Sequence, residues 1–395
     1  MKIFNGVFLF CVCTCYPLIA GAQQRSFQLP PGVAVAINPV NVDPAQEIGA
    51  IRLPPGFSIS LYAEGVDGAR SMAISPRGTL FVGTRRNAQR QPMDKVYAVV
   101  DRDGDQRADE VITIARGLNT PNGVAFRDGD LYVAEINRIL RFKDIESNLD
   151  NPPEPEVVTD TYPEEAHHGW KFIRFGPDGR LYVPVGAPCN TCEPDADHGV
   201  ITSINADGSD KQIFARGIRN SVGFDWDPRT GDLWFTDNGR DVWGDDIPPE
   251  ELNHAPEPGR HFGYPYRYGK SLVDTQFQTS MTDKDFTPAT LELPAHNAAI
   301  GMRFYNGEMF PAKYKNRIFI AAHGSWNRSV PDGYCIFAVD IKDSKVNGYE
   351  TFASGWLTAD KHFWGRPVDI ENMPDGSILV SDDHAGVIYR ISYNN

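Results

Sequence analysis

The sequence has few cysteines and no cluster of basic residues. Three of its six cysteines fall close to the N-terminus, and the others are Cys189, Cys192 and Cys335. So sparse a set excludes a disulfide-dense scaffold, and a domain of this length can bury its core without cross-links. Acidic residues outnumber basic ones by 52 to 38, which gives a net charge of −14. This balance argues against nucleic acid or an anionic membrane as a partner.

Long apolar runs are absent after the N-terminus, where one short run occurs. Lys2 precedes a largely apolar stretch that ends in the small residues Ala20-Gly21-Ala22, before Gln23. This pattern predicts a cleaved signal peptide over residues 1–22, with an uncleaved anchor as the alternative. Cleavage removes the first three cysteines and predicts a periplasmic or secreted protein without stable membrane insertion.

Amphipathic helical stretches are also few, whereas one strand-and-turn unit recurs six times. Four copies begin with glycine: Gly78-Thr-Leu-Phe-Val, Gly129-Asp-Leu-Tyr-Val, Gly179-Arg-Leu-Tyr-Val and Gly231-Asp-Leu-Trp-Phe. Two more continue the series with weaker turn chemistry: Asn316-Arg-Ile-Phe-Ile and Gly376-Ser-Ile-Leu-Val. Each unit is typical of a tight turn that enters a short apolar strand.

The spacing of these units predicts the fold. The first four recur about every 50 residues, the length of a four-stranded propeller blade. A longer interval before the fifth unit indicates an insertion near residues 246–297. We therefore predict an all-β, six-bladed β-propeller of four-stranded antiparallel blades over residues 51–395, after an N-terminal extension over 23–50. A two-sheet sandwich is the alternative, but it does not explain a unit of constant length.

Several polar residues interrupt the repeat beside its strands, where the loops of a propeller carry function. His167 and His168 precede the third unit; on a strand they would point to opposite faces, so that at most one faces the channel. Histidine suits proton transfer near neutral pH, with a structural role as the alternative. Arg219 and Asn220 precede the fourth unit. An arginine fork there suits anionic oxygens, with an inter-blade ion pair as the alternative.

Two acidic segments are candidate calcium sites. One has aspartates at alternating positions, namely Asp101, Asp103, Asp105 and Asp109. With Gly104 it resembles the front half of a calcium loop, although the glycine comes early and Ile112 occupies the last ligand position. The other is residues 241–253, after Asn238-Gly239-Arg240. Solvated loops remain the alternative for both segments.

The remaining clusters contain cysteine, arginine and tryptophan. Cys189 and Cys192 directly follow the third strand, and the spacing favours a local disulfide over a metal site. Cys335 is then left unpaired on a strand. Segments 323–328 and 364–369 combine arginine with tryptophan, which can hold a flat anionic aromatic by pairing and stacking. Structural tryptophans between blades are the alternative.

The order of these motifs resembles the soluble PQQ-dependent sugar dehydrogenases, and within them the glucose/sorbosone dehydrogenase family. The resemblance is carried by His168 to Tyr182, Gly217 to Asn220, Asn238-Gly239, Glu251-Leu-Asn253 and Gly263-Tyr-Pro265. It extends from about Leu53 to Ile391. It implies a six-bladed propeller with PQQ and calcium as cofactors, in a sorbosone dehydrogenase-like branch.

The resemblance also implies roles for single residues. His168 matches the base that takes the proton of the substrate hydroxyl. Residues implied to bind the cofactor are Arg219, Asn220, Asn238 and Arg366, with Arg328 or else His323 as a further cationic contact. Gly239 and Arg240 match positions whose backbone carbonyls coordinate calcium. Asn238 and Arg240 stand where one branch carries glutamine and proline, and these departures bear on the substrate more than on the chemistry.

Together these inferences predict a PQQ- and calcium-dependent enzyme that oxidises an aldose or sugar aldehyde. His168 takes the hydroxyl proton as hydride leaves the adjoining carbon for the quinone. No haem attachment motif is present, so a separate electron acceptor is expected. Two alternatives are a calcium-dependent sugar lactonase, with a metal held by Asn220, Asp237 and Asn238, and a non-catalytic binding propeller.

Overall fold

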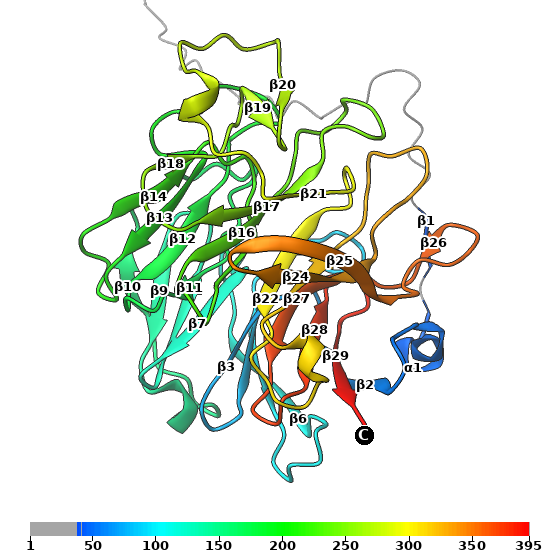
Figure 1. Ribbon diagram of the computed structural model, residues 1–395. Helices are drawn as coiled ribbons and strands as arrows, with labels where there is room; N and C mark the ends of the chain where they lie inside the picture. Colours follow the sequence, from blue (N-terminus) through cyan, green and yellow to red (C-terminus); the bar gives the residue numbers. More distant parts are fainter. Residues whose placement is uncertain (1–37, 41, 395) are drawn as a thin grey trace, which may run out of the picture. The chain divides into compact units, whose positions relative to one another are not determined.

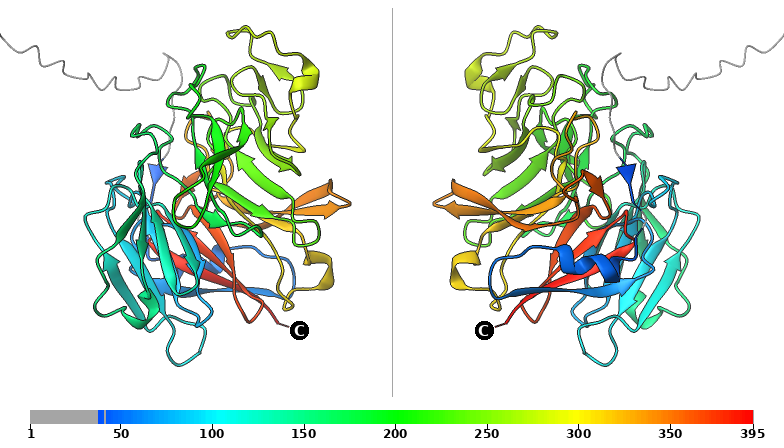
Figure 2. Two further views of the ribbon diagram at one scale, coloured as in Figure 1. Left: turned by 90° about the vertical axis from the view of Figure 1, so that its left-hand side faces the viewer. Right: turned by 90° about the vertical axis from the view of Figure 1, so that its right-hand side faces the viewer.

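Six four-stranded antiparallel sheets follow one another along the chain and are arranged as the blades of a propeller (Figures 1 and 2). The computed structural model describes residues 38–40 and 42–394. The predicted signal peptide over 1–22, and most of the extension over 23–50, lie outside the described residues. The predicted fold class is confirmed.

Each blade has four strands, ordered below from the innermost to the outermost. Blade 1 is β3 (Ala69–Ile74), β4 (Leu80–Thr84), β5 (Val96–Val100) and β6 (Glu110–Ala115), and blade 2 is β7 (Gly123–Arg127), β8 (Asp130–Ala134), β9 (Ile139–Phe142) and β10 (Glu156–Thr159). Blade 3 is β11 (Arg174–Phe175), β12 (Leu181–Val185), β13 (Val200–Ile204) and β14 (Gln212–Arg216), and blade 4 is β15 (Gly223–Trp226), β16 (Leu233–Asp237), β17 (Glu250–Ala255) and β21 (Leu291–Leu293). Blade 5 is β22 (Ala299–Phe304), β23 (Ile318–Ala322), β24 (Cys335–Lys342) and β25 (Lys345–Ser354), and blade 6 is β27 (Pro367–Asn372), β28 (Ile378–Asp382), β29 (Val387–Tyr393) and β2 (Phe57–Glu64).

The six predicted turn-and-strand units form the second strands of the six blades. The glycines that open the units have φ between 76° and 92°, namely Gly78, Gly129, Gly179, Gly231 and Gly376. Glycine enters this left-handed region without steric cost. Asn316 replaces glycine in blade 5 with φ of 59°, and asparagine is among the residues that tolerate this conformation.

The propeller closes through a strand that the repeat does not contain. β2, which precedes the first blade in the sequence, pairs with β29 as the outermost strand of blade 6. Figure 1 shows this strand beside the C-terminal end. Hydrogen bonds therefore join the first and last blades.

The predicted insertion lies between the third and fourth strands of blade 4. It carries β18 (Arg260–His261) and the hairpin of β19 (Arg267–Tyr268) with β20 (Leu272–Val273). β18 adds in parallel to β14 of blade 3, while the hairpin projects beyond the blades (Figures 1 and 2).

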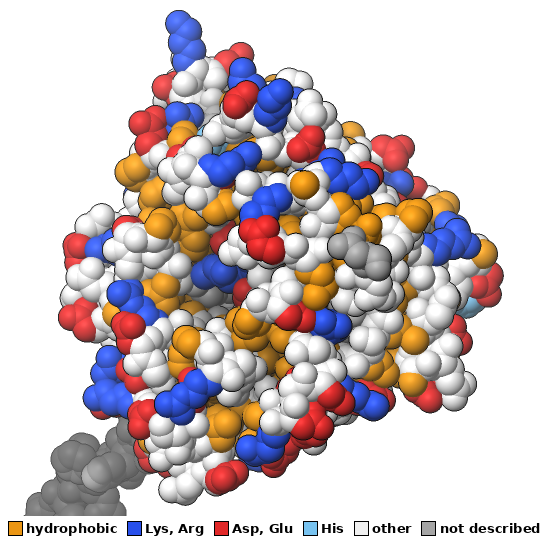
Figure 3. All heavy atoms as spheres, turned by 60° about the horizontal axis from the view of Figure 1, so that its bottom comes forward, with side chains coloured by type: hydrophobic (Ala, Val, Ile, Leu, Met, Phe, Trp, Pro, Cys, Tyr) orange, Lys and Arg blue, Asp and Glu red, His pale blue; other side chains and the backbone are white. Residues whose placement is uncertain are grey.

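Apart from this insertion, the described residues outside the blades form short elements. These are β1 (Asn38–Pro39), which pairs with β26 (His362–Phe363), the helix α1 (Pro44–Glu47), and 3-10 turns at Ile48–Ala50, Ile145–Ser147 and Ala312–Tyr314; a further 3-10 turn, Asp283–Asp285, belongs to the insertion. In the described part of the chain, no helix is long and apolar enough to cross a membrane. Acidic and basic side chains are interspersed over the face shown in Figure 3.

The strand registers bring two segments of each blade to one end of the propeller. Ala69 at the start of β3 pairs with Thr84 at the end of β4, and blades 2 and 4 repeat this pattern. The segment that enters the first strand of a blade and the segment that leaves its second strand therefore lie together. We call this end the entry face; the turns at Gly78 and its equivalents lie at the opposite end.

Candidate active site

His168 lies in a turn of the entry face and not on a strand. Its ring is 4.1 Å from that of His167, so the expectation of opposite faces, which assumed a strand, is wrong. The reason is the backbone: His168 has φ of 52°, a conformation that costs a non-glycine residue roughly 1–3 kcal/mol and occurs preferentially at functional sites. His168 is buried and His167 is exposed. Of the two rings, that of His168 is the one enclosed within the entry face.

One ring nitrogen of His168 is fixed by the backbone. Nδ1 lies 2.9 Å from the carbonyl oxygen of Ala187. A carbonyl only accepts, so Nδ1 carries the proton and Nε2 keeps a free lone pair. Burial, followed by the charge of Arg219, holds the pKa of His168 well below its usual value. The side chain is a neutral imidazole with one free acceptor, which is the form of a general base.

The segment after β12 passes so close to His168 that its first residue must be glycine. A Cβ on Gly186 would lie 2.5 Å from the Cβ of His168 and 3.2 Å from the carbonyl oxygen of Arg219. Ala187 donates its N–H to the same carbonyl at 2.8 Å. This close approach holds His168, which precedes blade 3, near the backbone of Arg219, which precedes blade 4.

Arg219 is buried and its guanidinium is held by the protein. Nε and Nη2 donate to the backbone and side-chain oxygens of Asn190 at 2.9 and 2.8 Å. Nη2 also donates to Asp241 at 2.8 Å, and Nη1 donates to the carbonyl oxygen of Asn238 at 3.1 Å. These bonds engage all but one of the guanidinium N–H donors. Arg219 is therefore a rigid cation with a single donor left for a ligand.

The neighbours of Arg219 leave further polar groups without partners. Asp237 accepts the backbone N–H groups of Arg219 and Asn220 at 2.8 and 2.6 Å, and burial raises its pKa to about 6. Asn238 donates Nδ2 to the carbonyl oxygen of Asn220 at 2.8 Å. Its Oδ1 is buried, with no partner in the described part of the chain. The structure thus brings together Arg219, Asn220 and Asn238, as the resemblance implied.

The predicted calcium positions Gly239 and Arg240 have backbone oxygens that are available to a metal ion. The N–H of Gly239 donates to Glu250 at 2.9 Å, and burial raises the pKa of this carboxyl group to about 8. The carbonyl oxygens of Gly239 and Arg240 accept no hydrogen bond from the described residues. The Arg240 guanidinium is engaged elsewhere, since it pairs with Asp274 and lies 4.7 Å from the Trp243 ring. Only its carbonyl group is available to a metal.

Arg366 lies on the blade 6 side of the entry face. Its Nε and Nη2 donate to the carbonyl oxygens of His323 and Gly324 at 3.0 and 2.7 Å. His323 pairs with Asp383 at 2.8 Å, and Arg70 donates to the other oxygen of Asp383 at 3.1 Å. Burial, followed by the charge of Arg366, lowers the pKa of His323 to about 3. His323 is therefore neutral near neutral pH.

Arg328 is occupied by a structural role. It donates to the backbone oxygens of Asp245 and Ala295 and to the carboxylate of Asp246. The bonds to Ala295 and Asp246 measure 3.2 and 3.3 Å. Nε donates to the carbonyl of Val330 as well. Because these contacts fix the loop around Asp245, we do not include Arg328 in the proposed cofactor site.

The other acidic segment lies at the opposite end of blade 1, in the hairpin between β5 and β6. Asp101, Asp103 and Asp109 each offer an oxygen within 4.8 Å of the others, so these three are able to hold a metal. Asp105 is not part of this group and accepts the N–H of Arg107 at 2.8 Å. Any ion bound here is remote from His168.

Cys189 and Cys192 form a disulfide, with their Cα atoms 6.1 Å apart. Cys335 is a free thiol, buried on β24. The hydroxyl of Tyr264 accepts the N–H of Cys192 at 3.1 Å. The disulfide closes the short loop that carries Asn190, and this loop thereby presents the oxygens that bind Arg219.

Three residues of this site were not identified from the sequence: Asn190, Arg85 and Trp170. Asn190 lies between the two cysteines, and the sequence does not indicate that its amide contacts Arg219. Arg85 directly follows β4, beside a strand of the repeat, but its neighbours carry no motif. Trp170 lies two residues after the base, with its ring 5.8 Å from His168 and its Nε1 buried without a partner among the described residues.

Comparison with known proteins identifies relatives across the whole propeller. The family model described as "Domain of unknown function (DUF7133)" matches residues 43–391. An uncharacterized protein of Borreliella burgdorferi is 38% identical over 299 residues, which cover 72% of this chain and 78% of that protein. Aldose sugar dehydrogenase YliI of Escherichia coli is 26% identical over 254 residues, which cover 58% of this chain and 61% of that protein.

A solved structure shares the fold at low sequence identity. The holo form of the pyranose dehydrogenase PQQ domain from Coprinopsis cinerea aligns with a TM-score of 0.70 and 17% identity, over 87% of this chain and 97% of that domain. This likeness supports the six-bladed architecture, while the sorbosone branch stays a prediction. From the family match and the Borreliella relative, we conclude that the chain belongs to the DUF7133 family.

Proposed function

We propose that this protein is a PQQ- and calcium-dependent dehydrogenase that oxidises an aldose or sugar aldehyde at the entry face. The observation that carries the proposal is His168, a buried neutral imidazole with a fixed Nδ1–H and a free Nε2, beside the rigid guanidinium of Arg219. Two relatives support it, namely the aldose sugar dehydrogenase of Escherichia coli and the PQQ domain of the Coprinopsis pyranose dehydrogenase.

The groups around the base fit an acidic quinone. Arg219 and Arg366 have hydrogen-bond donors that no described residue engages, and the Oδ1 of Asn238 is buried without a partner among the described residues. Buried polar atoms nearly always find a partner, so these atoms indicate a bound group. Arg219, Asn220 and Arg366 would hold PQQ. When bound, PQQ supplies an electrophilic carbonyl carbon that accepts hydride.

The 238–240 segment fits calcium. This ion prefers oxygen ligands, including backbone carbonyls and side-chain amides. The free carbonyls of Gly239 and Arg240, with the unpartnered Oδ1 of Asn238, provide three such oxygens within one short segment. Calcium held there would supply positive charge beside the cofactor.

The chain itself contributes the base and its fixed surroundings. Nε2 of His168 accepts the hydroxyl proton of the sugar, while the two electrons leave the adjoining carbon as hydride. A sugar hydroxyl is a far weaker acid than an imidazolium whose pKa is already depressed. The proton therefore moves together with the hydride. Asn190 and Asp241 hold the guanidinium of Arg219, so it cannot turn away from the site to pair with another negative charge.

Titration with PQQ tests this proposal. In the presence of calcium, PQQ is expected to bind the purified protein with a red-shifted absorbance, and sugar oxidation with a dye acceptor is expected to require both additions. Calcium removal by a chelator is expected to abolish the activity and calcium alone to restore it. A protein that neither binds PQQ nor oxidises any sugar would refute the proposal, and acid release from a sugar lactone without any acceptor would favour a lactonase.

The acid side of the pH profile gives an independent check. Because burial and Arg219 lower the pKa of His168 below about 6.5, the base stays unprotonated as the pH falls through that value. We expect kcat/KM to stay constant down past pH 6.5 and to fall only at lower pH. Circular dichroism at each pH excludes unfolding as the cause. A decline centred at or above pH 6.5 would contradict the assignment of His168.

We also propose that the predicted signal peptide over 1–22 directs the enzyme to the periplasm or the exterior. The disulfide in the loop beside Arg219 is in keeping with an oxidising compartment. A separate electron acceptor there would reoxidise the cofactor. The sorbosone dehydrogenase-like branch is our proposal for the substrate preference.

A further inference from the structure

The loop that leaves β4 brings an arginine to the entry face without giving it an acceptor. The guanidinium carbon of Arg85 lies 3.3 Å from the centre of the Trp170 ring. Its side chain makes no hydrogen bond or ion pair with the described residues, in contrast to Arg70, Arg219 and Arg366. Arg85 is partly exposed, so a ligand is able to reach it.

The charges around Arg85 are mainly positive. Arg70, Arg86 and Arg366 all interact with it, whereas Asp383 is the carboxylate that does so. Both oxygens of Asp383 are already taken, one by His323 and one by Arg70. Near neutral pH the cluster therefore has more guanidinium groups than carboxylates to balance them, in a chain whose net charge is −14. Such a cluster favours an anion.

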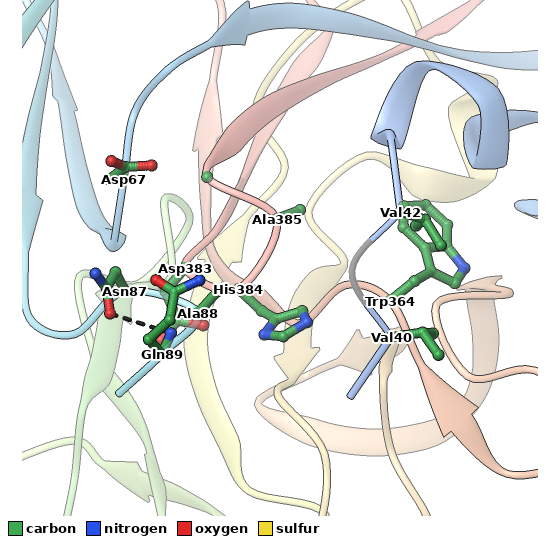
Figure 4. A pocket seen from close by; sticks show the side chains of 11 residues that line it. Val40, Val42, Asp67, Asn87, Ala88, Gln89, Trp364, Asp383, His384 and Ala385 are labelled. Atoms are coloured by element: carbon green, nitrogen blue, oxygen red, sulfur yellow. Dashed lines mark hydrogen bonds between the residues drawn. The ribbon is translucent and has the colours of Figure 1, made fainter. Parts of the chain in front are cut away.

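Asp383 of this cluster lines a neighbouring pocket of about 170 Å³, shown in Figure 4, although the guanidinium groups themselves are not part of its lining. Asn87 and Gln89, from the same loop as Arg85, line it together with Asp383 and His384. Pockets for drug-sized ligands occupy roughly 300–1,000 Å³, so this one suits a single small polar molecule. Amide and carboxylate side chains of this kind hydrogen-bond hydroxyl groups.

Trp170 connects Arg85 with the base. Its ring lies edge-on to His168 at 5.8 Å, and Arg85 stacks on its face. Arg85 and His168 therefore lie beside the same ring, so that one small molecule is able to reach the guanidinium and Nε2 together. The orphaned Nε1 of Trp170 adds a second donor at the same place.

We propose that Arg85 and Trp170 form a binding site for a carboxylate carried by the substrate, so that the enzyme accepts a sugar acid such as a uronate. This inference rests on the proposed function for its substrate class. Arg85 provides a planar fork that matches a carboxylate, and stacking on Trp170 fixes the plane of that fork. Arg219 and Arg366, on blades 4 and 6, remain for the cofactor.

Binding calorimetry with the protein saturated in PQQ and calcium tests this site, using D-glucuronate and D-glucose as probes. The wild-type protein is expected to bind glucuronate at least tenfold more tightly than glucose. Arg85→Met is expected to weaken glucuronate binding by at least tenfold, the size of one charge-assisted hydrogen bond, and to leave glucose unchanged. Arg85→Lys, which keeps the charge, is expected to retain part of the preference. Because no electron acceptor is added, at most one sugar per protein is oxidised, and the binding isotherm is read after that single turnover.

Two further measurements separate this site from its alternatives. Arg77→Met removes a charge from the exposed turn between β3 and β4, at the opposite end of blade 1, and is expected to change neither sugar's affinity by more than twofold. The affinity for PQQ, measured by absorbance, is expected to be unchanged in Arg85→Met. Equal binding of the two sugars by the wild type would overturn the proposal. So would an Arg85→Met variant that loses PQQ and keeps glucuronate, because the carboxylate would then be the cofactor's.

Discussion

Replacing His168 with alanine is expected to lower kcat for sugar oxidation by about 10²- to 10⁴-fold, the usual contribution of a positioned base. His168 provides a free imidazole nitrogen on a ring that Ala187 holds in one orientation. Affinity for PQQ, measured by absorbance titration, is expected to stay within twofold of wild type, because the proposed cofactor contacts come from other residues. Retention of full activity would show that the base is wrongly assigned.

Two variants serve as controls for that experiment. His168→Asn keeps a side chain that tolerates φ of 52°, and it should lose activity to the same extent as alanine without destabilising the turn. His167→Ala removes the exposed neighbouring ring and should change kcat by less than threefold. If His167→Ala abolished activity instead, the two histidines would have to exchange roles.

The six-bladed fold was predictable because the structure of its second strands is encoded locally. A residue able to adopt positive φ, followed by alternating large apolar residues, specifies a turn and a strand within a few residues of each other, and this recurs from Gly78 to Gly376. The closing pair was not predictable in the same way. β2 pairs with β29, which lies at the other end of the sequence, and the local pattern of Phe57–Glu64 does not indicate which strand it pairs with.

The candidate site was predictable where polar residues interrupt the repeat, as at His168 and Arg219. It was not predictable where a role depends on contacts between loops of different blades. Asn190 matters because its oxygens meet Arg219, and Arg85 because its guanidinium meets Trp170. Arg328 shows the converse, because its place in segment 323–328, which combines arginine with tryptophan, did not indicate that carbonyl groups near Asp245 engage it.

The ion pairs at the centre of the propeller lead to the prediction with the largest expected effect on stability. Glu371 of blade 6 accepts from Arg303 of blade 5 at 2.7 Å and from Arg174 of blade 3 at 3.2 Å. Arg174 also lies 3.3 Å from Asp225 of blade 4. Arg303 is 1% exposed. Four blades therefore meet through these charges, of which Arg303 and Glu371 are almost fully shielded from water.

Glu371→Ala is expected to lower the free energy of unfolding by about 3–5 kcal/mol, because it leaves the buried charge of Arg303 without its carboxylate. Chemical denaturation measures this loss. Glu350→Ala is the matched control: it breaks an exposed pair with Arg317 of 2.9 Å, and pairs of that kind contribute about 0–1 kcal/mol. Removing both charges in Glu371→Leu/Arg303→Met should recover part of the loss, since a buried pair replaced by apolar side chains costs less than one broken in half. Equal losses in Glu371→Ala and Glu350→Ala would mean that the central charges are solvated, and the closed packing of the inner strands would then have to be reconsidered.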